Sequence, residues 1–106
     1  MEFELETMIR SLVAQHKFRI DEKHILRERA QRGFTTEEVL YSLKNGFLYK
    51  LQKPHRVLWG YQQDKNLIVL SLWLLDVDGE FAVNWHKSNS LIIDLVYVKT
   101  AYRKDA

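Results

Sequence analysis

Apolar residues recur at intervals of three and four positions from the start of the chain. They are Leu5, Met8, Ile9, Leu12 and Val13. This spacing predicts an amphipathic helix over residues 2–16, followed by a connector over residues 17–20. Because such a stripe cannot stay exposed without promoting association, we expect it to pack either on the sheet of its own chain or on a second copy.

Two further helices are predicted by their end signals. Asp21 is a suitable N-cap for a helix that occupies the following eleven residues and ends at Gly33. Thr35 and Glu38 have the spacing of a capping box, which predicts a third helix that Gly46 terminates.

From Phe47 onward the pattern changes to that of β-strands. Strands are expected over residues 47–52, 56–62, 67–75, 80–86 and 91–99. The third is apolar on both faces, which predicts a central position with the last strand beside it. The Asp-Gly pair before the fourth strand predicts a hairpin turn. The polar end, residues 100–106, is expected to fray.

Together these elements predict a single domain, residues 1–106, of the α+β class. The expected architecture is three N-terminal helices followed by a four- or five-stranded antiparallel sheet, with the helices on one face. Short connections favour antiparallel neighbours. In this interpretation residues 1–16 form an accessory helix.

Composition narrows the class of protein. The chain has 106 residues, 46% of them hydrophobic, and it contains no cysteine, which excludes disulfides and thiolate metal sites. The longest apolar run covers residues 67–75 and is interrupted only by Ser71, far short of the roughly 20 residues of a membrane-spanning helix. The acidic start of the chain is unlike a signal peptide, so we expect a soluble cytoplasmic protein.

Positive charge is concentrated in one segment, although the net charge is only +2. Between Gln15 and Arg32 lie six basic residues: Lys17, Arg19, Lys23, Arg27, Arg29 and Arg32. This can be a solvated helical face or a contact surface for an anionic ligand, since the arginine fork matches phosphate. Arg29 falls on the apolar side of its helix, where it either snorkels outward or presents its guanidinium in a cleft.

Other candidate residues are fewer. The four histidines are dispersed and no ligand motif occurs, so neither a metal nor a cofactor is expected. Asp94 interrupts an apolar strand. It is neutral or paired if its face is buried, and a charge on an edge strand if that face is exposed. The predicted sheet is rich in aromatic residues, most of them expected in the core, while an exposed subset could stack the bases of a single-stranded nucleic acid.

Residues 24–39, HILRERAQRGFTTEEV, resemble a family of small bacterial and phage domains of unknown function. The shared signature is a histidine, an arginine midway, an Arg-Gly pair and a capped helix that ends in glycine, and the likeness covers about residues 21–98. The arginine expected four residues after the histidine is replaced here by Glu28, so either Arg27 or Arg29 could take its role. The family is related to the RelE/barnase-like ribonuclease toxin superfamily, whose members cleave RNA without a metal.

This resemblance implies a catalytic set and a binding set. The catalytic set is His24 as general acid or base, Arg29 on the phosphate, and His86 as a second proton carrier, with Tyr97 as an alternative to His86. The ligand-binding set is Arg27, Arg32, Lys17 and Arg19.

Two functions are therefore expected from the sequence. One is a non-catalytic phage or mobile-element domain that binds nucleic acid or protein, and the other is a metal-independent ribonuclease of toxin type. The implied partners are RNA, an antitoxin or other protein, or a second copy of the chain.

Overall fold

The computed structural model describes residues 2–25, 34–83 and 92–105. Its elements are α1 (Glu2–Ala14), β1 (Phe18–Ile20), α3 (Thr36–Asn45), β2 (Phe47–Lys53), β3 (Arg56–Gln63), β4 (Asn66–Leu75) and β5 (Leu95–Asp105). A further helix begins at residue 22, and its described part ends at residue 25.

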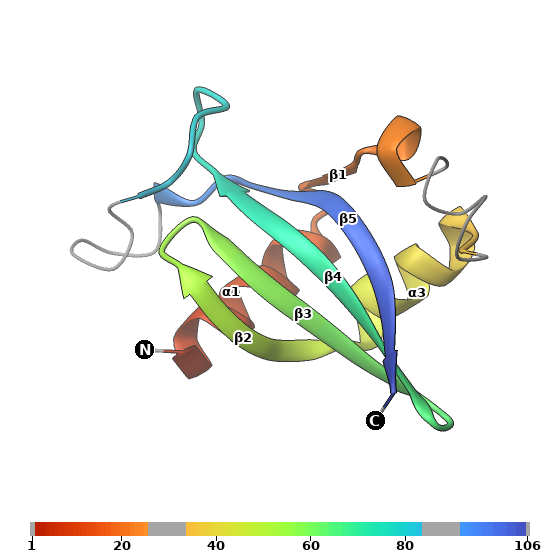
Figure 1. The fold of residues 1–106 in the computed structure, drawn as a ribbon. Coiled ribbons are helices and arrows are strands. Elements are labelled where there is room, and N and C mark those ends of the chain that lie inside the picture. Colours follow the sequence, from red (N-terminus) through yellow and green to blue (C-terminus); the bar gives the residue numbers. More distant parts are fainter. Residues whose placement is uncertain (1, 26–33, 84–91, 106) are drawn as a thin grey trace.

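The sheet has five strands in the order β1-β5-β4-β3-β2, and it is mixed (Figure 1). β1 pairs with β5 in parallel, while the other neighbours are antiparallel. The class is α+β, but the predicted arrangement of three helices followed by an antiparallel sheet is wrong. The expected connector, residues 17–20, contains β1, which therefore separates α1 from the later helices. A three-residue strand has no periodicity to detect, and its pairing with a strand near the other end of the chain is non-local.

The order of the central strands agrees with the prediction from the sequence. β4 lies between β3 and β5, so the central position of the apolar strand and its neighbour are both confirmed. The polar end was predicted wrongly: β5 continues to Asp105, with Thr100 opposite Ser71 and Asp105 opposite Asn66. It stays ordered because the long strand β4 supplies hydrogen-bond partners along its whole length.

The strand expected over residues 80–86 is represented, in the described part, by a single bridge between Phe81 and Leu75. The rest of that segment, from residue 84, lies outside the described residues.

α1 packs on the sheet of its own chain. Leu5, Ile9, Leu12 and Val13 are at most 7% exposed and belong to the main core. α1 and α3 lie on the same side of the sheet (Figure 1), and the core fills the space between them and the strands. Of the two alternatives for the apolar stripe, the structure therefore shows packing within the domain.

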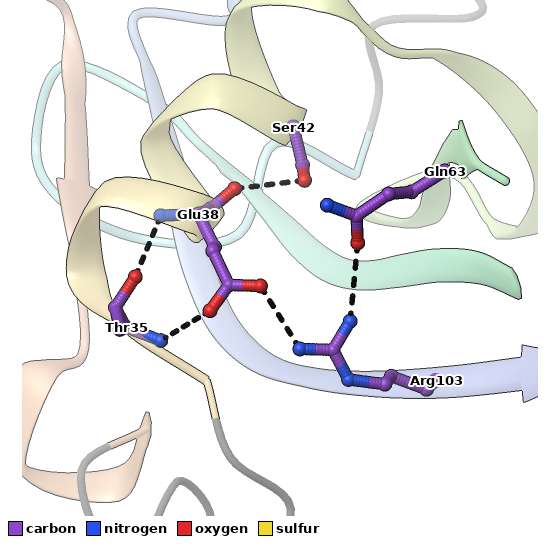
Figure 2. A network of polar contacts seen from close by, with 5 residues as sticks. All are labelled: Thr35, Glu38, Ser42, Gln63 and Arg103. Atoms are coloured by element: carbon purple, nitrogen blue, oxygen red, sulfur yellow. Dashed lines mark hydrogen bonds and ion pairs between the residues drawn. The ribbon is translucent and has the colours of Figure 1, made fainter.

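The start of α3 is fixed by the predicted capping box (Figure 2). The hydroxyl of Thr35 accepts from the Glu38 N–H at 3.0 Å, and the Glu38 carboxylate accepts from the Thr35 N–H at 3.1 Å. The same carboxylate accepts from Arg103 on β5 at 2.9 Å, and Arg103 also donates to Gln63 at 3.3 Å. The hydrogen bond from Arg103 lowers the pKa of Glu38. One side chain thus caps the helix and ties it to the sheet.

Candidate nucleic-acid interface

The side chains of β4 divide between two faces of the sheet. Those of Ile68, Leu70, Leu72 and Leu74 enter the main core beneath the helices. Because successive side chains of a strand point to opposite faces, the residues between them project to the other face, which we call the outer face. At one end of the outer face Leu58, Leu67 and Val69 form a small second cluster with Tyr102. The other end is aromatic and charged.

Residues in register form a straight row across this second end. Arg19 of β1 lies opposite Tyr97 of β5, Tyr97 opposite Trp73 of β4, Trp73 opposite Arg56 of β3, and Arg56 opposite Lys53 of β2. Directly opposed residues share a face, so all five belong to the face that carries Trp73. We call Arg19, Tyr97, Trp73, Arg56 and Lys53 the outer row. It places two aromatic rings between cations that come from three different strands, with Arg19 on one side and Arg56 and Lys53 on the other.

The rings at the middle of the row are close together. Trp73 and Tyr97 are stacked, with centroids 5.8 Å apart and planes at 25°. Phe81 meets Trp73 edge-on at 5.3 Å. The ammonium of Lys99 lies 5.1 Å from the centre of the Trp73 ring, within the range of a cation–π contact. Trp73 and Tyr97 are half-buried and Phe81 is 42% exposed, so aromatic surface remains open to solvent.

Asp21 holds Lys99 in this position. Its carboxylate forms an ion pair with the Lys99 ammonium at 2.9 Å, and it also accepts from the His24 N–H at 3.1 Å. The hydrogen bond from Lys99 lowers the pKa of Asp21, and the same bond raises the pKa of Lys99. Burial, followed by its hydrogen bond to Asp21, raises the pKa of Tyr97. At neutral pH the site therefore presents an ammonium beside an uncharged phenol.

Beside the row lies a hollow of about 560 Å³. Its lining residues are Trp73, Leu75, Gly79, Glu80, Phe81 and Tyr97, and we call it the aromatic hollow. The turn that lines one side of it is held by Asp76, whose carboxylate accepts from the N–H groups of Asp78 and Glu80 at 2.9 and 3.0 Å. Gly79 has a φ of +81°, a conformation that favours glycine. The Asp-Gly signal thus predicts this turn correctly.

His55 borders the same region from the turn between β2 and β3. Its ring packs on Phe81 with centroids 4.4 Å apart. Burial, and then the nearby charges of Arg56 and Lys53, lower the pKa of His55, so it is neutral at pH 7. Its Nδ1 and the Nε of Arg56 are buried, and neither has a hydrogen-bond partner among the residues that the structure describes.

The predicted site residues have different positions. Arg19 belongs to the outer row, whereas Lys17 pairs with Asp94 at 3.3 Å in an exposed ion pair. Asp94 is therefore paired, but on an exposed surface rather than on a buried face, and it precedes β5 rather than interrupting it. His24 lies in the first turn of the helix that begins at residue 22, and its backbone N–H donates a hydrogen bond to the Asp21 carboxylate. The other four, Arg27, Arg29, Arg32 and His86, lie outside the described residues.

Sequence analysis missed Trp73, Lys99 and Arg56 as site residues. A signal was present for Trp73, because it alternates with the aliphatic positions of β4 that face the helices. No sequence signal shows that Arg56 and Tyr97 flank it, since that depends on the register of three strands.

Among the described residues no group of three or more histidine, aspartate and glutamate side chains is placed to hold a metal ion. None of the described helices combines the length and apolarity required to cross a membrane. Comparison of the chain with known proteins finds no matching family model, curated protein or solved structure.

Proposed function

We propose that the protein binds single-stranded nucleic acid, RNA in the first instance, on the outer face of its sheet and without cleaving it. The observation that carries this proposal is the outer row, in which the stacked pair Trp73 and Tyr97 has Arg19 on one side and Arg56 on the other.

The aromatic pair supplies sites for bases. Aromatic side chains on a sheet face stack with unpaired bases of RNA, and each such contact contributes about 1–3 kcal/mol. Trp73 and Tyr97 keep part of their surface open, and no α-helix covers this side among the described residues. A single strand, whose bases are free to turn toward the protein, fits this surface better than a duplex, whose bases are stacked inside.

The cations supply sites for phosphates. Arg19 and Arg56 are three strand spacings apart, or about 14 Å, so they can contact the backbone on both sides of the stacked bases. Lys53 adds positive charge along the same path, and Lys99 adds an ammonium whose charge is offset by its ion pair with Asp21. A guanidinium group can donate two parallel hydrogen bonds to two oxygens of one phosphate. Such bidentate contacts would orient the strand across the row.

Binding without cleavage is favoured over the ribonuclease alternative. Cleavage of the expected kind needs a proton carrier beside the phosphate site. Among the described residues His55 borders the aromatic hollow, but its ring is packed on Phe81 and one of its nitrogens is buried, so it is poorly placed to carry a proton. The predicted catalytic set of His24, Arg29 and His86 remains a prediction.

Matched tyrosine substitutions test the proposal. Tyr97→Ala should weaken the binding of a labelled oligouridine of about ten nucleotides by roughly 10-fold, measured by fluorescence anisotropy at low salt. Tyr41→Ala removes an exposed tyrosine from α3, and it should leave the affinity unchanged. The same oligonucleotide should remain intact on a denaturing gel with EDTA. Equal affinities for the wild-type protein and Tyr97→Ala would contradict the proposal.

A further inference from the structure

The aromatic hollow contains one acidic side chain in otherwise apolar and aromatic surroundings. Resting on the proposed function, we infer that this hollow receives one base of the bound strand, and that Glu80 selects guanine there. The strand would lie on the outer row, and one nucleotide would turn its base into the hollow.

The hollow adjoins the row directly. Trp73 and Tyr97 belong to both, so a base in the hollow is next to a base stacked on the row. Its volume of about 560 Å³ falls within the usual range of small-molecule sites, and most of its lining is apolar. Phe81, edge-on to Trp73, gives it a second aromatic wall. An unstacked base thus finds surfaces that replace its lost stacking neighbours.

Glu80 is presented to the hollow by a fixed backbone. Its N–H donates to the Asp76 carboxylate, and its carbonyl accepts from the Asp76 N–H at 2.7 Å. The residue is exposed and lines the hollow, and its carboxylate appears in none of the ion pairs found among the described residues. The two carboxylate oxygens can therefore accept from a ligand.

The chemistry of the bases determines the preference. An ionised carboxylate only accepts hydrogen bonds. Guanine has a ring N–H next to an amino group, so it can donate two parallel bonds to the two oxygens of one carboxylate. Uracil offers one ring N–H between two carbonyl oxygens, which a carboxylate repels. Cytosine and adenine offer an amino group beside an unprotonated ring nitrogen, which is again an acceptor.

The charge around the hollow favours a nucleotide over a small cation. Aromatic residues with one carboxylate also suit a methylated ammonium group. However, the Lys99 ammonium already lies 5.1 Å from the centre of the Trp73 ring, and Arg56 and Lys53 are nearby in the row. This positive charge opposes a second cation and attracts the phosphate that accompanies a base.

The test uses three oligouridines of about ten nucleotides that differ only at the central position, which is guanosine, inosine or uridine. Inosine keeps the ring N–H of guanosine and lacks its amino group. The wild-type protein should bind the guanosine strand roughly 10-fold more tightly than the inosine or uridine strand, since a bidentate pair discriminates by this order. Glu80→Gln should remove most of the difference. Glu37→Gln, which makes the same charge change on the exposed side of α3, should keep it.

The outcomes separate the two proposals. Equal binding of the three strands by the wild-type protein would overturn guanine selection and leave the proposed function intact. A preference that survives in Glu80→Gln would overturn the role of Glu80. Failure of the wild-type protein to bind any of the strands would contradict the proposed function itself.

Discussion

The two faces of the sheet carry different chemistry on the same strands. On β4 the side chains toward the helices are Ile68, Leu70, Leu72 and Leu74, each at most 1% exposed. On the outer face Leu67 and Val69 are also buried, but at the aromatic end the same strand presents Ser71, Trp73 and Leu75, which are half-buried. The first set is aliphatic and closes the core, whereas Trp73 in the second set lies among Arg56, Lys99 and Tyr97.

The two faces can be compared through one tryptophan on each of them. Trp59 on β3 is fully buried, its indole N–H donates to the Leu43 carbonyl at 3.1 Å, and its ring is part of the main core. Trp73 has its ring against Tyr97 and Lys99 with surface left open. Trp59 therefore contributes mainly to stability, whereas Trp73 keeps surface open to solvent, so substitutions at the two positions should have separable effects.

The largest effect is expected for Trp59→Ala. It removes the largest buried side chain of the core and leaves the Leu43 carbonyl without its donor, which should lower the free energy of unfolding by about 3–5 kcal/mol. Urea unfolding followed by circular dichroism measures this loss. A loss below about 1 kcal/mol would contradict the assignment of this face to the core.

The same substitution on the outer face should act on binding instead. Trp73→Ala should weaken oligouridine binding by about 1–3 kcal/mol, the range for a stacked base. Its effect on unfolding should be smaller than that of Trp59→Ala, because Trp73 is half-buried. Trp73→Phe keeps an aromatic ring and should retain most of the affinity. If Trp73→Ala leaves binding unchanged and unfolds the protein, the comparison between the faces fails.

An effect of intermediate size is expected when the pH is changed. Two carboxylates, Glu38 on the core side and Asp21 at the outer face, should make the stability of the fold depend on pH. The pKa of Glu38 is lowered by its hydrogen bond from Arg103, and that of Asp21 by its hydrogen bond from Lys99. A pKa that is lower in the folded state stabilises the fold above the unfolded-state pKa, and this contribution is lost as the pH falls through the folded-state pKa. Stability should therefore be level near neutral pH and decline below about pH 4.

Neutral variants distinguish the two carboxylates. Glu38→Gln and Asp21→Asn should each make the acid decline in melting temperature shallower. Only Asp21→Asn should change RNA affinity, with slightly tighter binding because it removes a negative charge beside Lys99. An unchanged acid decline in both variants would contradict the pKa assignments.

The smallest effect concerns salt. For single strands the slope of log affinity against log salt is about −0.7 for each phosphate contact. Arg19→Ala should make the slope shallower by roughly this amount. Lys44→Ala, which removes an exposed cation from the last turn of α3, should leave it unchanged. Equal slopes for the wild-type protein, Arg19→Ala and Lys44→Ala would show that Arg19 does not contact a phosphate.

Local signals in the sequence predicted local structure well. The capping box of Thr35 and Glu38 needs only residues three positions apart, and it forms as expected. Gly46 ends α3 as predicted, although the reason is close packing rather than backbone conformation. Its φ is −88°, and a Cβ there would lie 2.4 Å from the Gly60 carbonyl oxygen and 2.6 Å from the Trp59 indole nitrogen.

Features that depend on distant pairing were not predictable. The parallel pairing of β1 with β5 joins residues near positions 19 and 97, and no local pattern indicates it. Prediction of the candidate site from the sequence has the same limitation. Composition pointed to the basic segment 15–32, of which Arg19 belongs to the outer row. Arg56 and Trp73 become neighbours of Tyr97 only through the register of β3, β4 and β5.

The indole N–H signals of Trp73 and Trp59 test the central claim most directly, because they report on the two faces within one molecule. They can be assigned in ¹⁵N-labelled protein with single Trp→Phe variants and followed while an oligouridine of about ten nucleotides is added at low salt. We expect the Trp73 signal to shift progressively to saturation while the Trp59 signal stays in place. A shift at Trp59 with Trp73 unmoved, or saturable binding that moves neither signal, would contradict the assignment of the ligand to the outer face.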